Sequence, residues 1–464
     1  MKPFKLQEDT DGIVPGFLHA GYMRLTYPQI VAVGYFLVIL TGTLLLMLPA
    51  ATYQPGSIGF VGSLFTATSA TCVTGLVVGD TFTTFTLFGQ IVIICLIQIG
   101  GLGFLTILAM FGMFLRKRIG LRARTLMKES VNSLYVGGIV RLFRKILLGT
   151  MMFEGIGAVL FATRFIPRFG LVKGLWYSVF HAISAFCNAG FDLMGVIEPG
   201  SSLVYFADDP VVCLTVCALI LIGGIGFFVW DDVQRHGLNF ARYQLHTKLV
   251  LVITGIITLV STLLFLVLEY NNTFAGMPLW QKILDALFCS VTPRTAGFNV
   301  VDTASMTGSG RLLTVMLMFI GGSPGGTAGG IKTTTFAIIL ISAWNSLRNE
   351  SDNNVYGRRL EADALRRATA VSTINMSAIL IASFAICILQ PAIALSDALF
   401  EAASAIGTVG LSVGTTAQAG TAARLILTFL MYTGRCGSVS FALLFTENKN
   451  PGGARCPEEK ISIG

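Results

Sequence analysis

The sequence predicts an all-α integral membrane protein with four tandem helix–pore loop–helix (M1-P-M2) repeats around a pseudo-fourfold pore. Its 464 residues are 54% hydrophobic and 12% charged, and this charged share is far below the roughly 25% of soluble domains. Long apolar runs follow one another along the chain, as helices that cross a membrane require. A short motif with a glycine recurs between these runs at a nearly constant spacing, which indicates tandem repeats.

Eight apolar runs are the candidate spanning helices, and several approach the ~20 residues that a helix needs to cross the hydrocarbon layer. They cover residues 30–48, 85–115, 146–163, 211–230, 247–268, 311–345, 369–390 and 424–445. Within each successive pair of runs lies a shorter apolar stretch of 12–15 residues. Because this length is too short to cross, it is typical of a re-entrant half-helix.

The shorter stretches resemble one another when they are aligned on a glycine. Each has a Leu-Phe or Val-Phe pair, then small and polar residues, then glycine followed by Leu or Phe. They read LFTATSATCVTGL (64–76), VFHAISAFCNAGF (179–191), LFCSVTPRTAGF (287–298) and LFEAASAIGTVGL (399–411). The glycines are Gly75, Gly190, Gly297 and Gly410, which lie 115, 107 and 113 residues apart. The third copy is one residue shorter than the others.

Two full spans in each repeat return the chain to the same face, so all linkers between repeats lie on one side of the membrane. The expected division is a cytoplasmic N-terminus (1–29), repeat 1 (30–115), a basic linker (116–145), repeat 2 (146–230), a linker (231–246), repeat 3 (247–345), a linker (346–368), repeat 4 (369–445) and a C-terminal tail (446–464).

The side that carries the linkers is predicted to be cytoplasmic. Segment 116–145 holds nine Lys/Arg and one Glu, and segment 345–367 is also rich in arginine; basic residues in short loops mark the cytoplasmic face. The net charge of +8 therefore fits membrane orientation. The linkers have few aromatic residues, which argues against contact with nucleic acid. Residues 1–29 do not resemble a signal peptide, and a multi-pass plasma-membrane protein with a cytoplasmic N-terminus is expected.

Nothing in the sequence predicts an enzyme. The nine cysteines are scattered through apolar stretches without metal-ligand spacing, and the four histidines lie far apart, so no metal centre or catalytic relay is expected. The segments GGLGFL (100–105) and GGIGFF (223–228) fall inside predicted spans. They are interpreted as packing glycines and not as nucleotide-binding loops.

The four glycine turns are the candidate ion site. A non-helical backbone at membrane depth must be buried in protein or line water, and four such turns around one axis could offer carbonyl oxygens to a dehydrated cation. The expected filter residues are Val73, Thr74, Gly75, Asn188, Ala189, Gly190, Thr295, Ala296, Gly297, Thr408, Val409 and Gly410. None of them is acidic, which favours a large monovalent ion. Asp80, Asp192 and Asp302 lie just beyond the turns, either as an outer vestibule or as helix caps.

These turns, as SATCVTGL, SAFCNAGF, TPRTAGFN and SAIGTVGL, resemble the filters of the Trk/Ktr/HKT superfamily of potassium transporters. The segments GGSPGGTAGGIKTTTF (321–336) and YTGRCGSVSF (432–441) resemble that family's broken third-repeat helix and its fourth-repeat arginine motif, and the resemblance covers residues 22–464. The first span begins near residue 30 without two additional helices before it, so the chain looks closest to the Ktr membrane subunit. Cys72 and Cys187, just before the filter residues, are small departures.

The stretch GGSPGGTAGG (321–330) is expected to break the apolar run 311–345, because six glycines and a proline cannot continue a helix. An unwound loop below the filter could act as a gate, with its freed amides and carbonyls bonded to water or polar side chains. Close packing of helices on small residues is the alternative. The candidate gate residues are Gly321, Gly322, Ser323, Pro324, Gly325, Gly326, Thr327, Ala328, Gly329, Gly330, Lys332 and Arg435.

Arg435 lies within an apolar run, where a charge costs at least ~2.5–3.5 kcal/mol. It is therefore expected under the filter, either repelling cations or bonding the carbonyls of the broken helix. Lys332 either holds the end of the loop or reaches toward the cytoplasmic face. Glu154 is a further intramembrane charge, and the sequence names no partner for it.

The resemblance implies potassium uptake by a channel-like subunit, a homodimer in the membrane lipid, and a cytosolic nucleotide-binding ring subunit as regulatory partner. No cofactor is expected in the chain itself; K⁺ is the transported ion, and Na⁺ as an activator is left open. The alternative is an ion-coupled secondary transporter for another monovalent cation or solute. Repeats with two spans each have parallel topology, which argues against the inverted repeats of that class.

Overall fold

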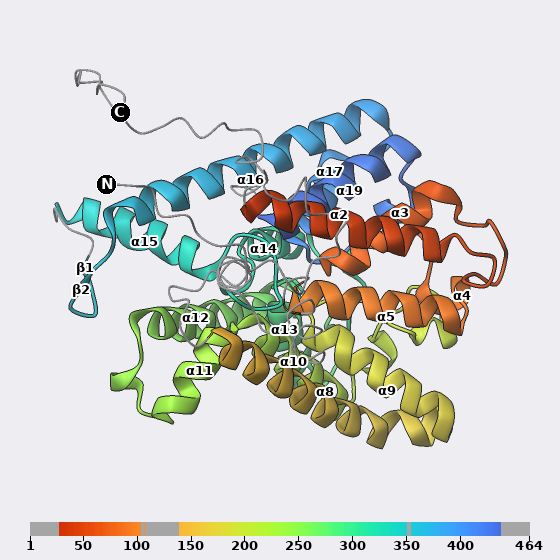
Figure 1. Ribbon diagram of the computed structural model, residues 1–464, viewed down its shortest axis with the longest axis horizontal. Helices are drawn as coiled ribbons and strands as arrows, with labels where there is room; N and C mark the ends of the chain where they lie inside the picture. Colours follow the sequence, from red (N-terminus) through yellow and green to blue (C-terminus); the bar gives the residue numbers. More distant parts are fainter. Residues whose placement is uncertain (1–26, 104–105, 107–138, 350–353, 438–464) are drawn as a thin grey trace, which may run out of the picture.

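The computed structural model describes residues 27–103, 106, 139–349 and 354–437, and nearly all regular structure in them is helical (Figure 1). Most of the predicted N-terminal segment 1–29, most of the basic linker 116–145 and the C-terminal tail lie outside these residues. The main helices of the predicted apolar runs are α2 (Tyr27–Leu46), α5 (Leu87–Leu102), α8 (Ile139–Phe169), α10 (Pro210–Gly224), α12 (Leu245–Leu268), α14 (Gly308–Phe319), α15 (Thr333–Leu347), α16 (Ala362–Leu389) and α19 (Thr421–Cys436). Each predicted apolar run therefore contains a helix.

Four helices in the described part of the chain, α2, α8, α12 and α16, are long and apolar enough to cross a membrane, and a bent pair makes a fifth candidate. Their outward faces carry large apolar side chains such as Val159 (66% exposed), Val267 (75%) and Phe384 (68%). Such contiguous apolar surface suits lipid and not water. The fold is that of a multi-pass helical membrane protein.

Four shorter helices of 13–16 residues occupy the repeated glycine stretches: α3 (Gly59–Cys72), α9 (Leu171–Phe186), α13 (Leu279–Val291) and α17 (Leu395–Gly407). Most of their residues are buried, whereas at most 44% of the apolar window of α2, α8, α12 or α16 is buried. Each ends directly before a non-helical corner, and the chain then runs through short elements to the next long helix. These elements are α4 (Thr81–Thr84), η2 (Met194–Val196), η3 (Val204–Phe206), η5 (Thr303–Ser305) and α18 (Thr415–Gln418).

Polar side chains begin the helices that follow the corners. Thr86 accepts a hydrogen bond from Gly89 N before α5, and Thr307 accepts one from Gly310 N before α14. Asp209 accepts bonds from Val211 N and Val212 N before α10, whose first residue is proline. Serine, threonine and aspartate are favoured at this position because they satisfy amides that the first helical turn leaves free.

The short helices contact the long helices in a cyclic order. Helix α5 contacts α9, α10 contacts α13, α14 contacts α17, and α19 contacts α3. The last contact brings the end of the described chain back to its beginning (Figure 1). There the Tyr432 hydroxyl of α19 donates to Ala32 O of α2 at 2.7 Å.

Two long helices are interrupted in mid-course. The run 311–345 is broken as expected, into α14 and α15 with residues 320–332 between them. The run 211–230 is also broken, which the sequence analysis did not predict. Helix α10 ends at Gly224, and α11 (Phe227–His236) continues at 93° to it. The bend lies at Gly226, whose φ of +99° is accessible to glycine but not to a helical residue.

The remaining elements lie away from the corners. A two-stranded hairpin of β1 (Asn354–Val355) and β2 (Arg358–Arg359) precedes α16, and η4 (Phe240–Arg242) precedes α12. Helix α11 extends past residue 230 into the segment predicted as a linker, and α8 and α16 begin before their predicted starts. Helices commonly extend beyond the membrane because their backbone bonds do not depend on lipid.

Candidate functional site

The four corners that follow α3, α9, α13 and α17 share one backbone conformation. The residue two before each glycine has a positive φ, and so has the glycine: Val73 (57°) and Gly75 (93°), Asn188 (60°) and Gly190 (68°), Thr295 (70°) and Gly297 (78°), Thr408 (50°) and Gly410 (92°). A side chain at positive φ costs of order 1–3 kcal/mol and clusters at functional sites. The same strained pattern therefore occurs at all four predicted sites.

Short polar side chains near the helix ends hold the corners in place. Ser69 Oγ accepts from Gly75 N at 3.0 Å, and Ser404 Oγ accepts from Gly410 N at 3.1 Å. In the second and third copies the hydroxyls of Ser184 and Thr292 donate to Phe191 O and Phe298 O, at 2.7 and 2.6 Å. Thr292 stands five residues before its glycine, whereas the serines stand six before theirs, so the shorter third copy keeps a hydroxyl at the corner.

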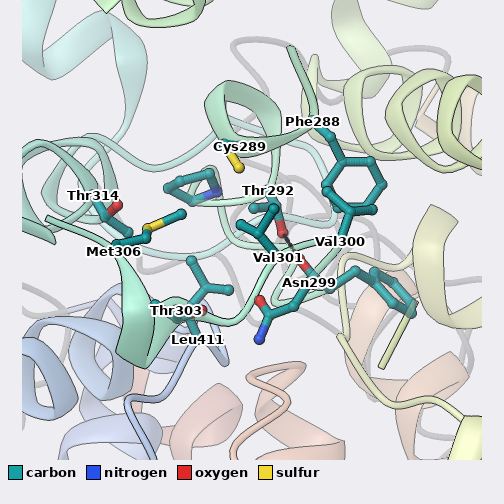
Figure 2. A pocket seen from close by; sticks show the side chains of 12 residues that line it. Phe288, Cys289, Thr292, Asn299, Val300, Val301, Thr303, Met306, Thr314 and Leu411 are labelled. Carbon is teal, nitrogen blue, oxygen red and sulfur yellow. Dashed lines mark hydrogen bonds between the residues drawn. The ribbon is translucent and has the colours of Figure 1, made fainter. Parts of the chain in front are cut away.

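Figure 2 shows the third corner from the side of a small cavity. Cys289 and Thr292 of the α13 end, Val301 of the following loop and Leu411, the residue after the fourth corner, line it together. The third and fourth corners are therefore neighbours.

The four glycines form a closed ring. A Cβ added to Gly75 would lie 2.5 Å from Ala189 O, one on Gly190 2.6 Å from Ala296 O, and one on Gly297 2.5 Å from Val409 O. A Cβ on Gly410 would overlap Thr74 O, which closes the ring on the first corner. Each glycine thus lies against the carbonyl that precedes the next glycine. Glycine is favoured at these four positions because it tolerates a positive φ. The close approach of a neighbouring carbonyl is a second reason for glycine, and only the structure provides it.

The interrupting loop, residues 320–332, is closed at its base. Ile320 and Ile331 form a bridge, Gly321 N donates to Ile331 O at 2.8 Å, and Thr333 N donates to Gly322 O at 3.0 Å. The hydroxyls of Ser323 and Thr333 lie 2.9 Å apart. The two helices α14 and α15 are therefore joined by a defined loop, called the glycine loop below.

Backbone groups of the α10–α11 bend form hydrogen bonds with backbone groups of the glycine loop. Ser323 N donates to Gly224 O at 2.8 Å, Thr327 N to Gly223 O at 3.1 Å, and Phe227 N to Gly325 O at 2.8 Å. The sequence led us to expect water or polar side chains in this role. It missed the bend itself, although the glycines of GGIGFF (223–228) were its signal. One broken helix thus supplies partners for another, so that three backbone amides freed by the interruptions are paired between them.

The glycine loop lies directly against two corners of the ring. A Cβ on Gly329 would overlap the Thr408 side chain of the fourth corner, and one on Gly330 would lie 3.1 Å from Gly407 O. At the second corner, Thr327 Oγ1 lies 3.2 Å from Asn188 Oδ1 and 3.2 Å from Phe186 O. The structure therefore brings the predicted filter residues and the predicted gate residues into contact.

Arg435 joins the loop to α5. Its guanidinium donates to Thr327 O, to Gly100 O and, at 3.3 Å, to Gly101 O. The carbonyls at the end of α5 carry the negative end of the helix dipole, which favours a cation. Gly100 itself packs against Thr71 O, as its interpretation as a packing glycine required. Lys332 donates from Nζ to Ala328 O at 2.7 Å, so of its two expected positions it takes the one at the end of the loop.

Two further buried charges lie beside the corners. Glu154 of α8 accepts from Gln98 Nε2 at 3.3 Å, and Cys187 Sγ lies 3.9 Å from its other oxygen. These residues are the partners that the sequence could not name. Arg294 (4% exposed) donates from Nη2 to Thr254 Oγ1 at 3.3 Å and lines a small cavity with Gly224 and Gly322.

The acidic residues beyond the corners accept hydrogen bonds from backbone amides that follow them in the chain. Asp80 accepts from Thr83 N at 2.8 Å, Asp302 from Ala304 N at 3.1 Å, and Asp192 from Met194 N at 2.9 Å. Burial, and secondarily the Asp80 carboxylate, raise the pKa of Asp192 to about 7, while the Met194 N–H acts in the opposite direction. Asp80 and Asp302 are thus the N-caps of α4 and η5, whereas Asp192 stabilises a local turn, because the N-cap of η2 is Leu193.

The fold is that of the multi-pass helical membrane proteins, and the four glycine corners form a ring of backbone within it. The sequence profile of the TrkH family, described as "Cation transport protein", matches residues 22–451. The chain belongs to this family, which consists of transporters and not of enzymes.

Curated relatives span nearly the whole chain. It is 40% identical over 447 residues to the "Ktr system potassium uptake protein B" of Bacillus subtilis, covering 96% of this chain and 98% of that protein. It is 38% identical to the "Potassium/sodium uptake protein NtpJ" of Enterococcus hirae, covering 95% and 98%. The crystal structure of the potassium transporter TrkH from Vibrio parahaemolyticus has the same fold, with a TM-score of 0.70, 17% identity, and coverage of 89% of this chain and 85% of that one.

Proposed function

We propose that the chain is the channel-like membrane subunit of a potassium uptake system, with its four corners as the selectivity filter. The observation that carries this proposal is the closed ring in which each corner glycine lies against the carbonyl of the next corner. Backbone carbonyls can replace the hydration shell of K⁺. The names of the Bacillus subtilis and Enterococcus hirae relatives support potassium as the ion.

In this proposal the four units of the sequence are M1-P-M2 repeats around the pore. The cyclic contacts of α5 with α9, α10 with α13, α14 with α17 and α19 with α3 support it. The filter residues are the twelve of the corners, from Val73–Gly75, Asn188–Gly190, Thr295–Gly297 and Thr408–Gly410. The linkers and the N-terminus face the cytoplasm and the protein lies in the plasma membrane, because the linkers are basic.

The glycine loop is proposed to be the gate. It lies against the second and fourth corners through Thr327 and Gly329. Arg435 and Lys332 bond its carbonyls and hold it there. Their positive charges also oppose the passage of a cation until the loop moves.

A homodimer and a cytosolic nucleotide-binding ring subunit are part of the proposal, with Na⁺ as a candidate activator. The words "Ktr system" in the name of the Bacillus subtilis relative support a further component, and "Potassium/sodium" in that of the Enterococcus hirae relative supports an effect of Na⁺. The basic linkers offer a surface on which such a partner could dock.

Uptake of K⁺ and of Na⁺ by the purified chain in liposomes, with and without a cytosolic partner, tests the function. We expect K⁺ to enter severalfold faster than Na⁺. Absence of K⁺ uptake under both conditions, or equal rates for the two ions, contradicts the proposal.

Replacement of Arg435 tests the gate in the same liposomes. Arg435→Gln should raise K⁺ flux, because it removes a charge that both fixes the loop and repels cations. Arg424→Gln is the matched control, since Arg424 begins the same helix and bonds Ala417 O at 3.0 Å, away from the loop. Equal flux in the two variants would show that Arg435 does not control conduction.

A further inference from the structure

Among the side chains at the corners, Asn188 makes contacts that its three counterparts do not. Its Nδ2 lies 3.3 Å from Arg294 O and 3.2 Å from Thr295 Oγ1, both at the third corner. Its Oδ1 lies 3.2 Å from the hydroxyl of Thr327 in the glycine loop. A carbonyl such as Arg294 O can only accept, so the amide nitrogen must face the third corner and the amide oxygen must face the loop.

Thr327 is fixed through each of its polar groups. Its amide donates to Gly223 O at the α10–α11 bend, its carbonyl accepts from Arg435, and its hydroxyl lies 3.2 Å from both Asn188 Oδ1 and Phe186 O. Thr327 is fully buried and Asn188 is 1% exposed, so water competes little for these bonds. This residue is where the loop is tied to the second corner.

The fourth corner lacks an equivalent bond. There the loop touches Thr408 through Gly329, but Thr408 Oγ1 has no hydrogen-bond partner among the described residues. Val73 at the first corner has no polar side chain, and Thr295 is bonded to Asn188 itself. In the described part of the chain, the side-chain hydrogen bonds between loop and corners therefore run from Thr327 to the second corner, to Asn188 Oδ1 and to Phe186 O.

We propose that Asn188 and Thr327 are positioning residues that couple the gate to the filter. The Thr327 hydroxyl holds the loop closed on the second corner. The Asn188 amide carries the position of the loop to the third corner through Thr295 and Arg294 O. When the loop opens, Asn188 Oδ1 loses its hydrogen bond to Thr327. The two hydrogen bonds from Asn188 Nδ2 to Arg294 O and Thr295 Oγ1 then still connect the second corner to the third. This inference rests on the proposed function of the ring as filter and of the loop as gate.

The coupling is tested with the full chain in liposomes, by K⁺ and Na⁺ uptake. Thr327→Val keeps the size of the side chain and removes the hydroxyl. It should raise K⁺ uptake about two- to tenfold, the population change that one hydrogen bond of ordinary strength controls. Thr327→Ser restores the hydroxyl and should rescue the lower uptake. The matched control is Thr314→Val, because Thr314 is equally buried and its hydroxyl donates to Gly310 O within its own helix at 2.9 Å.

Asn188→Ala separates coupling from simple packing. It should raise K⁺ uptake as Thr327→Val does and also lower the preference for K⁺ over Na⁺ about threefold or more, because the third corner loses its two amide bonds. The double variant should raise K⁺ uptake by less than the product of the two single effects, because both changes remove the Thr327–Asn188 bond, while Thr327→Val also removes the contact with Phe186 O. Multiplying effects in the double variant would overturn the coupling.

The outcomes separate a failure of this inference from a failure of the proposed function on which it rests. If the wild-type chain takes up no K⁺, the proposed function fails and the inference fails with it. If the wild type takes up K⁺ but Thr327→Val behaves as Thr314→Val does, the inference alone is wrong. Should Thr327→Val not fold, as judged by size-exclusion chromatography, Thr327→Ala replaces it and the same comparison with Thr314→Val decides.

Discussion

At the scale of single residues, the corner glycines are constrained twice. Gly410 has a φ of 92°, and a Cβ at this position would overlap Thr74 O of the first corner. The strain of positive φ alone costs of order 1–3 kcal/mol. The overlap would also displace the Thr74 carbonyl, which belongs to the ring, so a methyl group here alters the geometry of the proposed filter.

Replacement of Gly410 by alanine should therefore abolish selective K⁺ uptake, with a loss of tenfold or more in the ratio of K⁺ to Na⁺ rates. Gly155→Ala is the control. Gly155 is exposed on α8 with nothing within 4 Å of its added Cβ, and alanine should stabilise that helix by about 0.5–1 kcal/mol. Ion uptake in liposomes and thermal unfolding measure the two effects; selective uptake by Gly410→Ala would contradict the role of the ring.

The raised pKa of Asp192 predicts a pH-dependent stability. The folded carboxyl binds its proton more tightly than the unfolded one, whose pKa is near 3.9. This contribution is present below the unfolded pKa and is lost as the pH rises through the folded pKa of about 7. Asp192→Asn keeps an oxygen that can accept from Met194 N and removes the charge. It should melt higher than the wild type, and by a few degrees more at pH 8 than at pH 5, because the loss of stability in the wild type runs from the unfolded to the folded pKa.

Thermal unfolding in detergent at the two pH values measures this difference. Asp302→Asn is the control for the loss of a carboxylate that accepts a backbone hydrogen bond, because Asp302 caps Ala304 N at an exposed position. An Asp192→Asn variant with the same shift at pH 5 and pH 8 would refute the assignment.

At the scale of elements, two interrupted helices support each other. The α10–α11 bend and the glycine loop exchange three backbone hydrogen bonds, from Ser323 N, Thr327 N and Phe227 N. Neither interruption could exist alone within a membrane, because its polar groups would be left unpaired. A change at the bend should consequently move the loop.

Gly226→Ala is the variant that tests this dependence. The added Cβ would lie 2.6 Å from Pro324 O, so the loop must shift and K⁺ flux should rise severalfold. Gly237→Ala is a matched control, since Gly237 also has a positive φ (60°) but nothing within 4 Å of its Cβ position. It shares the backbone strain and lacks the contact with the loop. Similar flux in both variants would mean that strain, and not displacement of the loop, is responsible.

At the scale of the whole molecule, the chain closes on itself. Helix α19 contacts α2 and α3, and the Tyr432 hydroxyl donates to Ala32 O across about 400 residues of sequence. A ring needs this closure because each corner depends on the next for its position. The first and last units are therefore coupled in stability.

Tyr432→Phe should lower the free energy of unfolding by about 0.5–1.5 kcal/mol, the usual contribution of one hydrogen bond. Tyr205→Phe is the control, because the Tyr205 hydroxyl bonds Glu198 at a solvent-exposed site. Thermal unfolding of the two variants in detergent measures the difference. Equal melting temperatures would show that the hydrogen bond at the closure contributes nothing.

Much of this architecture could be read from the sequence alone, because membrane insertion is governed by local composition. The eight helical regions, the four short helices and the break at GGSPGGTAGG follow from apolar length, glycine and proline. These are properties of contiguous residues, and lipid enforces them wherever they occur in the chain. The spacing of Gly75, Gly190, Gly297 and Gly410 likewise indicated repetition without any coordinates.

The contacts between repeats were decided only by the tertiary structure. These contacts join residues from 33 to more than 300 positions apart in the chain. They include the bend at Gly226, the ring of glycines against carbonyls, the partners of Glu154 and the Asn188–Thr327 bond. Their geometry depends on how four units pack around a common centre. The local sequence pattern does not determine that packing. A glycine looks the same in sequence whether it turns a chain, packs a helix or makes room for a distant carbonyl.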